Sequence, residues 1–209
     1  MAHENSLLSF ERIVFFSDAV FAIVITLLVL EIKVPHLSER SESALVSELV
    51  HLLPKFFGFV CSFFVVGLMW VEHHRIFRYI ELFDSGLIWR KLVFLLFIWF
   101  IPFPTALFSE YFWSKTAFMI YVTVFGLAAL AKLVVWNHAV KRGLTNADAD
   151  DLLKRRIARR SLAVPLGCLV CLVLGLFLPT FLAFLGFPLI PLFAYLLDPG
   201  KTAKITAAE

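Results

Sequence analysis

The sequence predicts an all-α membrane protein with six transmembrane helices per chain. Two observations predict it. First, 61% of the 209 residues are hydrophobic, 24 residues are Phe, and the mean hydropathy is +0.89, which is more apolar surface than a soluble core can use. Second, six apolar stretches approach or exceed the roughly 20 residues that a helix needs to cross the hydrocarbon core.

The expected spans follow one another closely. They are 13–34, 53–77, 87–108, 112–136, 161–179 and 181–197. The second is longer than the bilayer is thick, so we expect it to tilt or to project from the membrane. Pro102 and Pro104 should kink or end the third, and Pro188 and Pro191 should break up the sixth, because proline lacks the N–H that a helix needs. We expect a single six-span transmembrane domain over 1–209, with a short outer helix between the first two spans.

Basic residues predict the orientation. If the N-terminus lies inside the cell, 15 of the 19 Lys and Arg residues fall on the inner side of the spans. The four on the outer side are then Lys33, Arg40, Lys55 and Lys115. Because cytoplasmic segments of membrane proteins carry the excess of Lys and Arg, both termini should be cytoplasmic. The net charge of +3 gives no indication of a nucleic-acid partner, and we expect none.

The first span has two different faces. At about 100° per residue, one stripe is apolar apart from one threonine and consists of Phe16, Ala19, Val20, Ile23, Thr26, Leu27, Leu30 and Val34. Asp18 lies about 140° from Ile23 around the helix. An ionisable group in a span is costly unless it is paired or wetted, so Asp18 marks a site with a role. Periodicity leaves two interpretations open: the stripe faces lipid while Asp18 faces the protein, or the stripe itself carries the function.

Other reactive side chains are explained without special chemistry. His73 and His74 are adjacent and point about 100° apart on a helix, so a shared ion would need ligands from other spans. Cys168 and Cys171 have the spacing of a redox pair but lie among Leu and Val within a span. The sequence contains no nucleophile–base pairing, phosphate loop or dinucleotide motif. We therefore expect no catalytic residue, enzyme activity, metal site, cofactor or small-molecule substrate.

The first span closely resembles the signature of a known family, the prokaryotic relatives of transmembrane protein 175, the potassium channel of lysosomes. The residues that carry the likeness are Arg12, Phe16, Ser17, Asp18, Ala22, Ile23, Thr26, Leu27, Leu28, Val29 and Leu30. Ala19 departs from the pattern, since a Gly is common there. A looser likeness at the end of the second span comes from Trp70, His73, His74 and Phe77.

The resemblance implies a homotetrameric potassium-selective channel in the plasma membrane of a prokaryote, with lipid as its surroundings and potassium ions as the permeating species. The first helix of each subunit would line the pore. It further implies that Ile23 forms the narrowest ring, that Leu27 and Leu30 form further rings, and that Thr26 is a polar layer. The helix-locking residues would be Arg12, Phe16, Ser17, Asp18, Trp70, His73 and His74.

The spacing of the apolar residues agrees with that implication. Ile23, Leu27 and Leu30 follow i, i+4, i+7 spacing, so four copies around an axis would give stacked apolar rings. A ring too tight for a hydrated ion gates by dewetting, and potassium loses its water more readily than sodium, which predicts modest selectivity without a carbonyl filter. The alternative is a proton-coupled secondary cation transporter that uses Asp18 with His73 or His74 as a proton relay. The sequence has no inverted repeat, which favours the channel.

Overall fold

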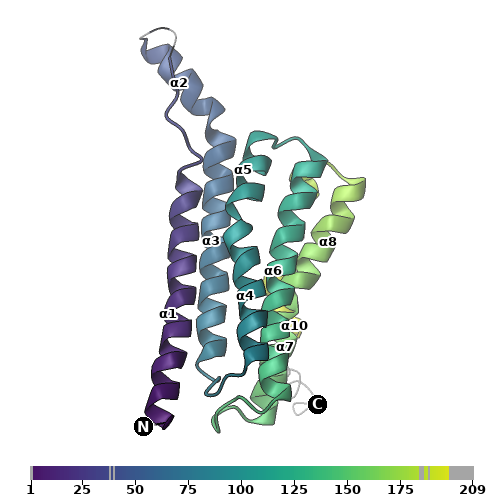
Figure 1. Ribbon diagram of the computed structural model, residues 1–209. Coiled ribbons are helices and arrows are strands. Elements are labelled where there is room, and N and C mark those ends of the chain that lie inside the picture. The colour runs from purple at the N-terminus through teal and green to yellow at the C-terminus, as the bar shows by residue number, and fades with distance from the viewer. Residues whose placement is uncertain (1, 38, 40, 184–185, 188, 198–209) are drawn as a thin grey trace.

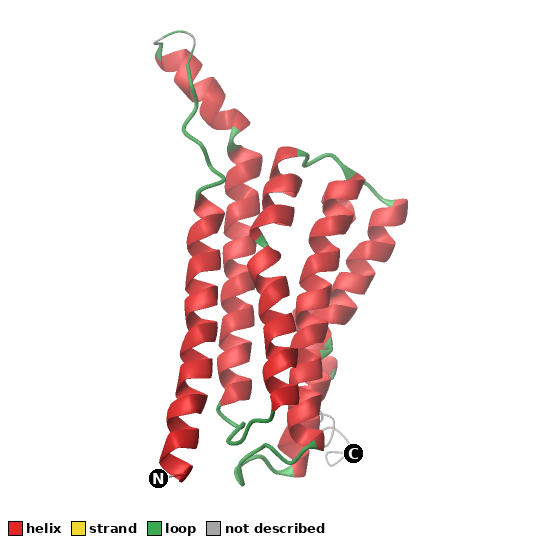
Figure 2. Cartoon of the chain, viewed as in Figure 1, coloured by secondary structure: helices red, strands yellow, loops and turns green. Residues whose placement is uncertain are grey.

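The computed structural model describes residues 2–37, 39, 41–183, 186–187 and 189–197, with side chains from residue 12 onward except 181 and 191. Within that part of the chain, every regular element is a helix apart from one isolated bridge between Ile80 and Thr145 (Figure 2). Five helical stretches there are long and apolar enough to cross a membrane, and they stand side by side as a bundle (Figure 1). They cover Arg12–Val29, Leu53–Phe77, Ser85–Glu110, Lys115–Lys141 and Asp151–Phe177. The single domain over 1–209 stays a prediction.

The first two expected spans are helical, but the first ends earlier than expected. The helix α1 covers Ala2–Val29, so it stops before the expected limit at residue 34. After Val29 the backbone bonds tighten to i→i−3, with Leu30 N–H on the carbonyl of Leu27, and Pro35 follows, which disfavours helix in the residues just before it. The expected outer helix is α2, Glu42–His51, capped by the Ser41 side chain, and it projects beyond the bundle (Figure 1). The helix α3 covers Leu53–Phe77, the range expected from the sequence.

Prolines divide the third span as expected. The helix α4 covers Ser85–Phe100 and α5 covers Pro102–Glu110, and Ile101 between them keeps a helical conformation, so the chain bends without reversing. The hydroxyl of Thr105 donates to the carbonyl of Ile101 at 2.9 Å, which satisfies part of the backbone at the bend. Thr105 also bonds Ser62 of α3 at 2.9 Å, which in turn bonds Tyr121 at 3.0 Å. This buried hydroxyl chain ties the bend to two neighbouring helices.

The core of the bundle lies around α6, Lys115–Lys141. Its large side chains Phe118, Tyr121, Phe125 and Trp136 are almost wholly buried, because α6 packs against both α4 and α5 and against α8. The fifth span joins α7, Asp151–Ser161, to α8, Ala163–Phe177. Leu162 between them is also helical, so α7 and α8 run on as one bent helix. The bundle therefore begins at α1 on one side and ends at α8 on the other (Figure 1).

The last expected span, 181–197, is not one continuous helix. Its described parts are the short helices α9, Thr180–Ala183, and α10, Leu189–Leu196. Residues 184–185 and 188 lie outside the description. Gly186 packs so closely on Cys171 of α8 that a Cβ there would clash with its sulfur, and proline at 188 and 191 removes two helical donors. Among the described residues, five stretches rather than six are thus helical over a full membrane width.

Two loops at the N-terminal end of the bundle bind each other. The backbone N–H of Glu81 donates to the carbonyl of Leu144, and Asn146 N–H donates to the carbonyl of Tyr79, at 3.0 Å in both cases. This pairing joins the α3–α4 loop to the α6–α7 loop. It sets where α4 begins, and α4 in turn contacts α1.

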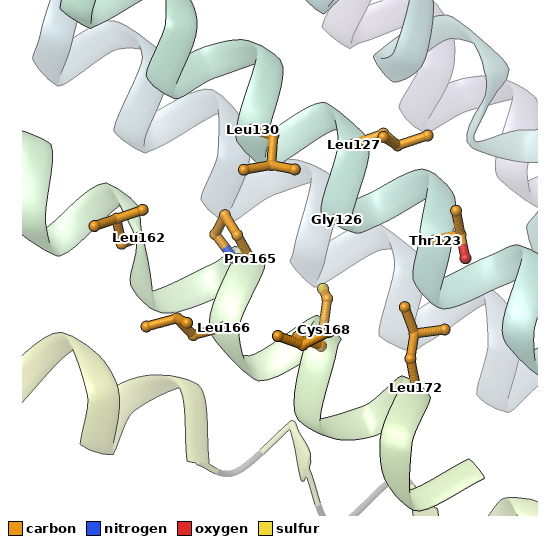
Figure 3. A pocket seen from close by; sticks show the side chains of 10 residues that line it. Thr123, Gly126, Leu127, Leu130, Leu162, Pro165, Leu166, Cys168 and Leu172 are labelled. Atoms are coloured by element: carbon orange, nitrogen blue, oxygen red, sulfur yellow. The ribbon is translucent and has the colours of Figure 1, made fainter. Parts of the chain in front are cut away.

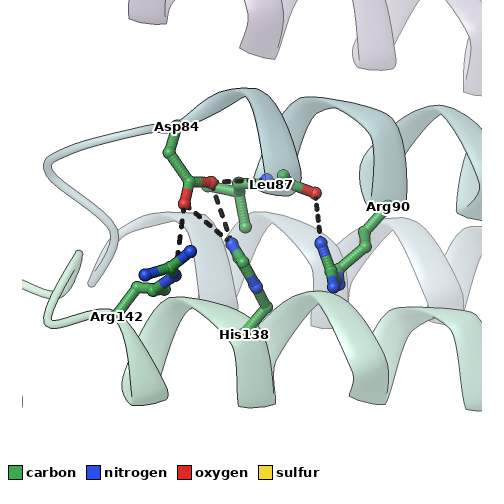
Figure 4. A network of polar contacts seen from close by, with 6 residues as sticks. Asp84, Leu87, Arg90, His138 and Arg142 are labelled. Atoms are coloured by element: carbon green, nitrogen blue, oxygen red, sulfur yellow. Dashed lines mark hydrogen bonds and ion pairs between the residues drawn. The ribbon is translucent and has the colours of Figure 1, made fainter.

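Asp84 fixes the start of α4 (Figure 4). Its carboxylate accepts the Leu87 N–H at 2.6 Å and so caps the helix, and it also accepts a hydrogen bond from Nε2 of His138 on α6 at 2.8 Å. Arg142 lies 3.8 Å away. The hydrogen bond from His138, followed by that from Leu87, lowers the pKa of Asp84 below its usual value.

Candidate functional site

The helix α1 has one face inside the protein and one face outside it. Ser17, Phe21, Val24 and Leu28 are buried, on the side where α1 packs against α3, α4 and α5. On the opposite side Ile23 remains 51% exposed. A helix of this kind has a face that its own protomer leaves uncovered.

The uncovered face follows a seven-residue repeat. Five of its exposed positions are spaced alternately by three and four residues: Phe16, Ala19, Ile23, Thr26 and Leu30. Phe15, Ala22 and Val29 are exposed beside them. Leu30 is 68% exposed, whereas Leu27 is partly buried. Repeats of this spacing are those that pack identical helices about a common axis. The structure thus distinguishes Leu27 from the other expected pore residues.

Thr26 is the polar member of this face. Its hydroxyl donates to the carbonyl of Ile23 at 2.8 Å, so the proton is used within the helix. The oxygen keeps acceptor capacity on the exposed side. Thr26 therefore presents an oxygen between the apolar side chains of Ile23 and Leu30.

Asp18 lies at the boundary between the two faces of α1 and is held by α3. The indole Nε1 of Trp70 donates to its Oδ1 at 2.9 Å. Trp70 also lies against His74, with the ring centroids 5.8 Å apart. The carboxylate is thereby paired with a hydrogen-bond donor, which reduces the cost of placing it within a span.

A second link holds α1 to α4 and was not foreseen from the sequence. The buried side chain of Lys91 donates from Nζ to the backbone carbonyl of Ile13 at 2.8 Å. The Ser17 hydroxyl donates to the same carbonyl at 3.0 Å. The Lys91 ammonium also lies 4.0 Å from the ring centre of Phe77. The signal available in the sequence was the lysine itself, placed inside an apolar helix one or two turns from its start.

The remaining expected locking residues lie in different surroundings. His73 is buried among aromatic rings, with centroid distances of 4.3 Å to Phe77 and 5.4 Å to Phe94. Within the described residues its Nε2 has no hydrogen-bond partner. His74 is exposed beside Trp70, and Arg12 is exposed at the N-terminal end of the span. His73 therefore packs among aromatic rings, and in the described part of the chain no hydrogen bond joins Asp18 to either histidine.

The described residues also contain no group of three or more His, Cys, Asp or Glu side chains that could hold a metal ion. What the geometry provides is a helix bonded to α3 through Asp18 and to α4 through Lys91, with an apolar face and one threonine turned outward. This arrangement is typical of the class of membrane transport proteins, in which ion paths are built at the interface of several helices.

Comparison with known proteins gives the family. Residues 12–102 match the family model described as the endosomal/lysosomal potassium channel TMEM175. A protein of Chamaesiphon minutus named as a potassium channel is 40% identical over 151 residues, which are 71% of each chain. A Streptomyces collinus protein, also named as a potassium channel, is 36% identical over 164 residues, covering 74% of this chain and 79% of the relative. The protein belongs to the TMEM175 family.

Solved structures agree with this assignment. The crystal structure of a Chamaesiphon minutus homologue of the lysosomal potassium-selective channel TMEM175 superposes with a TM-score of 0.74 at 34% identity, covering 91% of this chain and 98% of the other. The human relative is named as an endosomal/lysosomal proton channel and is 42% identical over 80 residues, which are only 16% of its length.

Proposed function

We propose that the protein is a potassium-selective channel that conducts cations passively through a hydrophobic constriction. The observation that carries the proposal is the uncovered face of α1, on which Ile23, Thr26 and Leu30 point away from the helices of their own protomer. The names of the two bacterial relatives, both potassium channels, support it. They also favour a role other than catalysis.

The pore would form where four copies of α1 meet in a homotetramer. Ile23 would then make the narrowest apolar ring, and Leu30, two turns further along, would make a second ring. Thr26 would supply a ring of oxygens between them. A narrow apolar ring excludes hydrated ions until it is wetted, and potassium gives up its water at lower cost than sodium. The selectivity would therefore come from dehydration, with no ring of backbone carbonyls.

The links on the other face of α1 would hold these rings in register. Trp70 fixes Asp18 from α3, and Lys91 fixes the Ile13 carbonyl from α4. The two bonds approach α1 from different helices, so rotation of α1 about its own axis would break at least one of them. A constriction built from single side chains depends on such fixed rotation.

The broken C-terminal segment would complete a sixth crossing. Thr180, at its start, donates to the carbonyl of Phe112 at the far end of the bundle. The helix α10 packs against α8 and reaches α7 at the N-terminal end. Together α9 and α10 would return the chain across the membrane. Both termini would then lie in the cytoplasm of a prokaryotic cell, with the protein as a multi-pass component of the plasma membrane and without a cofactor.

The alternative predicted from the sequence, a transporter with a proton relay through Asp18 and a histidine, has less support than the passive channel. Asp18 is bonded to Trp70, and an indole N–H can donate but cannot accept a proton in turn. The name of the human relative, a proton channel, keeps proton permeation as an outcome to be measured.

Reconstitution into liposomes tests the proposal. Vesicles loaded with potassium should release it down its gradient with no proton gradient imposed, and vesicles loaded with sodium should release sodium more slowly. A pH-sensitive dye inside the same vesicles records any proton movement. Potassium release that occurs only with an imposed proton gradient would establish the carrier instead.

A further inference from the structure

An apolar groove runs between α6 and α8, on the side of the bundle away from α1 (Figure 3). Its volume is 340 Å³. The side chains and backbone that line it come from Thr123, Gly126, Leu127, Leu130, Leu162, Pro165, Leu166, Cys168, Leu169 and Leu172. Only Thr123 brings a polar side chain other than a thiol. In a membrane, a groove of this composition is suited to hydrocarbon rather than to water.

The position of the groove places it toward lipid. α1 packs against α3, α4 and α5, whereas the groove lies beyond α6 (Figure 1). If α1 lies at the centre of the assembly, α8 lies at its periphery. The groove is then open to the bilayer.

One face of the fifth span carries leucines that line the groove as well as two arginines. Leu162, Leu166 and Leu169 line the groove with i, i+4, i+7 spacing. Since α7 continues into α8 through the helical residue Leu162, the same face extends backward by three residues to Arg159 and by seven to Arg155. Both arginines are exposed. Within the described residues, neither arginine side chain takes part in an ion pair or a hydrogen bond.

A neighbouring groove lacks this combination. It lies between α4 and α6, with a volume of 360 Å³, and its lining includes Trp89, Leu127 and Arg90. Arg90 donates to the carbonyl of Gly86 on its own helix at 2.8 Å, so part of its guanidinium is already used. The α4–α6 groove therefore has one arginine that is partly engaged, whereas the face of the α6–α8 groove leads to two arginines whose side chains are not engaged in the part of the chain that the structure describes.

We propose that the α6–α8 groove binds one anionic phospholipid. An acyl chain lies between Leu127 and Leu166, and Arg155 and Arg159 bind the phosphate of the headgroup. Paired guanidinium groups suit phosphate because each offers several N–H donors in a planar fork. An uncharged or zwitterionic lipid can fill the groove but gains less from the arginines.

Lipid binding to the purified protein tests this proposal. Native mass spectrometry records how much phosphatidylglycerol or phosphatidylcholine the detergent-solubilised protein retains at equal added concentrations. The wild-type protein should bind phosphatidylglycerol about tenfold more tightly than phosphatidylcholine. In the double variant Arg155→Gln/Arg159→Gln this preference should disappear. Leu166→Trp, which fills the groove, should weaken retention of both lipids.

A matched control separates this site from general surface charge. Arg75→Gln/Arg78→Gln removes two charges from exposed positions at the same end of the bundle, around the end of α3, which does not line the groove. It should keep the preference for phosphatidylglycerol. The proposal is overturned if the wild-type protein shows no preference, or if the control loses as much of it as the arginine variant. It is also overturned if Arg155→Gln/Arg159→Gln changes subunit association while the lipid preference stays intact, since the groove would then contact another copy of the chain.

Discussion

Trp70 of α3 donates a hydrogen bond from its indole Nε1 to Oδ1 of Asp18 on α1, at 2.9 Å. The two residues are 52 positions apart in the chain, so the bond joins two separate spans. It gives the acidic residue of the first span a partner and leaves the apolar face of α1 on the other side. We therefore propose that Asp18 holds the helix in place and that the ion path follows the residues opposite it.

Removing the indole N–H of Trp70 should lower the stability of the helix bundle more than it alters ion selectivity. Trp70→Phe leaves the partly buried carboxylate without its bond, and we expect a loss of about 1–3 kcal/mol in the free energy of unfolding. Asp18→Asn keeps an oxygen that accepts the indole N–H and should lose less. Thermal unfolding in detergent measures the loss, and liposome flux measures the potassium-to-sodium ratio. A large change in that ratio at unchanged stability would place Asp18 in the ion path.

The two groups that bind the Ile13 carbonyl should depend on each other. Lys91→Met and Ser17→Ala each remove one side-chain donor, and the remaining one still bonds the lone pair of the carbonyl that the helix backbone leaves open. The double variant loses both, so its destabilisation should exceed the sum of the single losses by about 0.5–2 kcal/mol. Unfolding measurements on the four proteins of this cycle give the coupling. Additive losses would mean that the two donors hold α1 independently.

The sequence predicted those parts of the molecule that depend on local pattern. Hydropathy and length located the span 53–77, and the prolines located the bend at Ile101. The 3.6-residue helical period predicted that Ile23 and Asp18 lie on different faces of α1. The resemblance brought Asp18 together with the segment around Trp70, but it could not specify the hydrogen bond between them.

Other features depend on contacts between distant segments and could not be predicted from the sequence. The bond from Lys91 to the Ile13 carbonyl needs α4 to lie at one particular height beside α1, which no local pattern encodes. Leu27 and Leu30 look equivalent in the sequence, and only the packing of α1 on its neighbours half-buries Leu27. Pro188 and Pro191 predicted a break in the span 181–197, whose described parts are two short helices, but the close packing of Gly186 on Cys171 needs α8 beside it and could not be predicted.

Acid should loosen the junction between α4 and α6. The pKa of Asp84 is lowered by its hydrogen bonds from His138 and Leu87, so ionised Asp84 stabilises the folded state at pH values above its unfolded pKa of about 4. That contribution is lost as the pH falls through the lower folded pKa. The unfolding temperature of the wild-type protein should therefore drop in this range, and that of Asp84→Asn should change less. Asp151→Asn, at a site whose side chain is 89% exposed, serves as the control and should follow the wild type.

The oxygen of Thr26 should ease the passage of ions between the apolar rings. Thr26→Val keeps the shape of the side chain and removes the oxygen. We expect potassium flux to fall about fivefold, the effect of roughly 1 kcal/mol added to the barrier. Thr123→Val, in the groove between α6 and α8, provides the control and should leave flux unchanged. Equal flux in the wild type and Thr26→Val would remove Thr26 from the pore.

The central claim is that the uncovered face of α1 lines the pore with its narrowest point at Ile23. The most direct measurement compares liposome flux of Ile23→Asn with that of Val29→Asn. Val29 is also an exposed apolar residue of α1, but it lies about 120° from Ile23 around the helix.

A polar ring should wet the constriction, so Ile23→Asn should raise potassium flux by roughly tenfold, equivalent to about 1.4 kcal/mol off the barrier, and bring the potassium and sodium rates closer together. Val29→Asn should match the wild-type protein in both respects. The claim is contradicted if Ile23→Asn conducts and selects as the wild type does, or if Val29→Asn reproduces its effect.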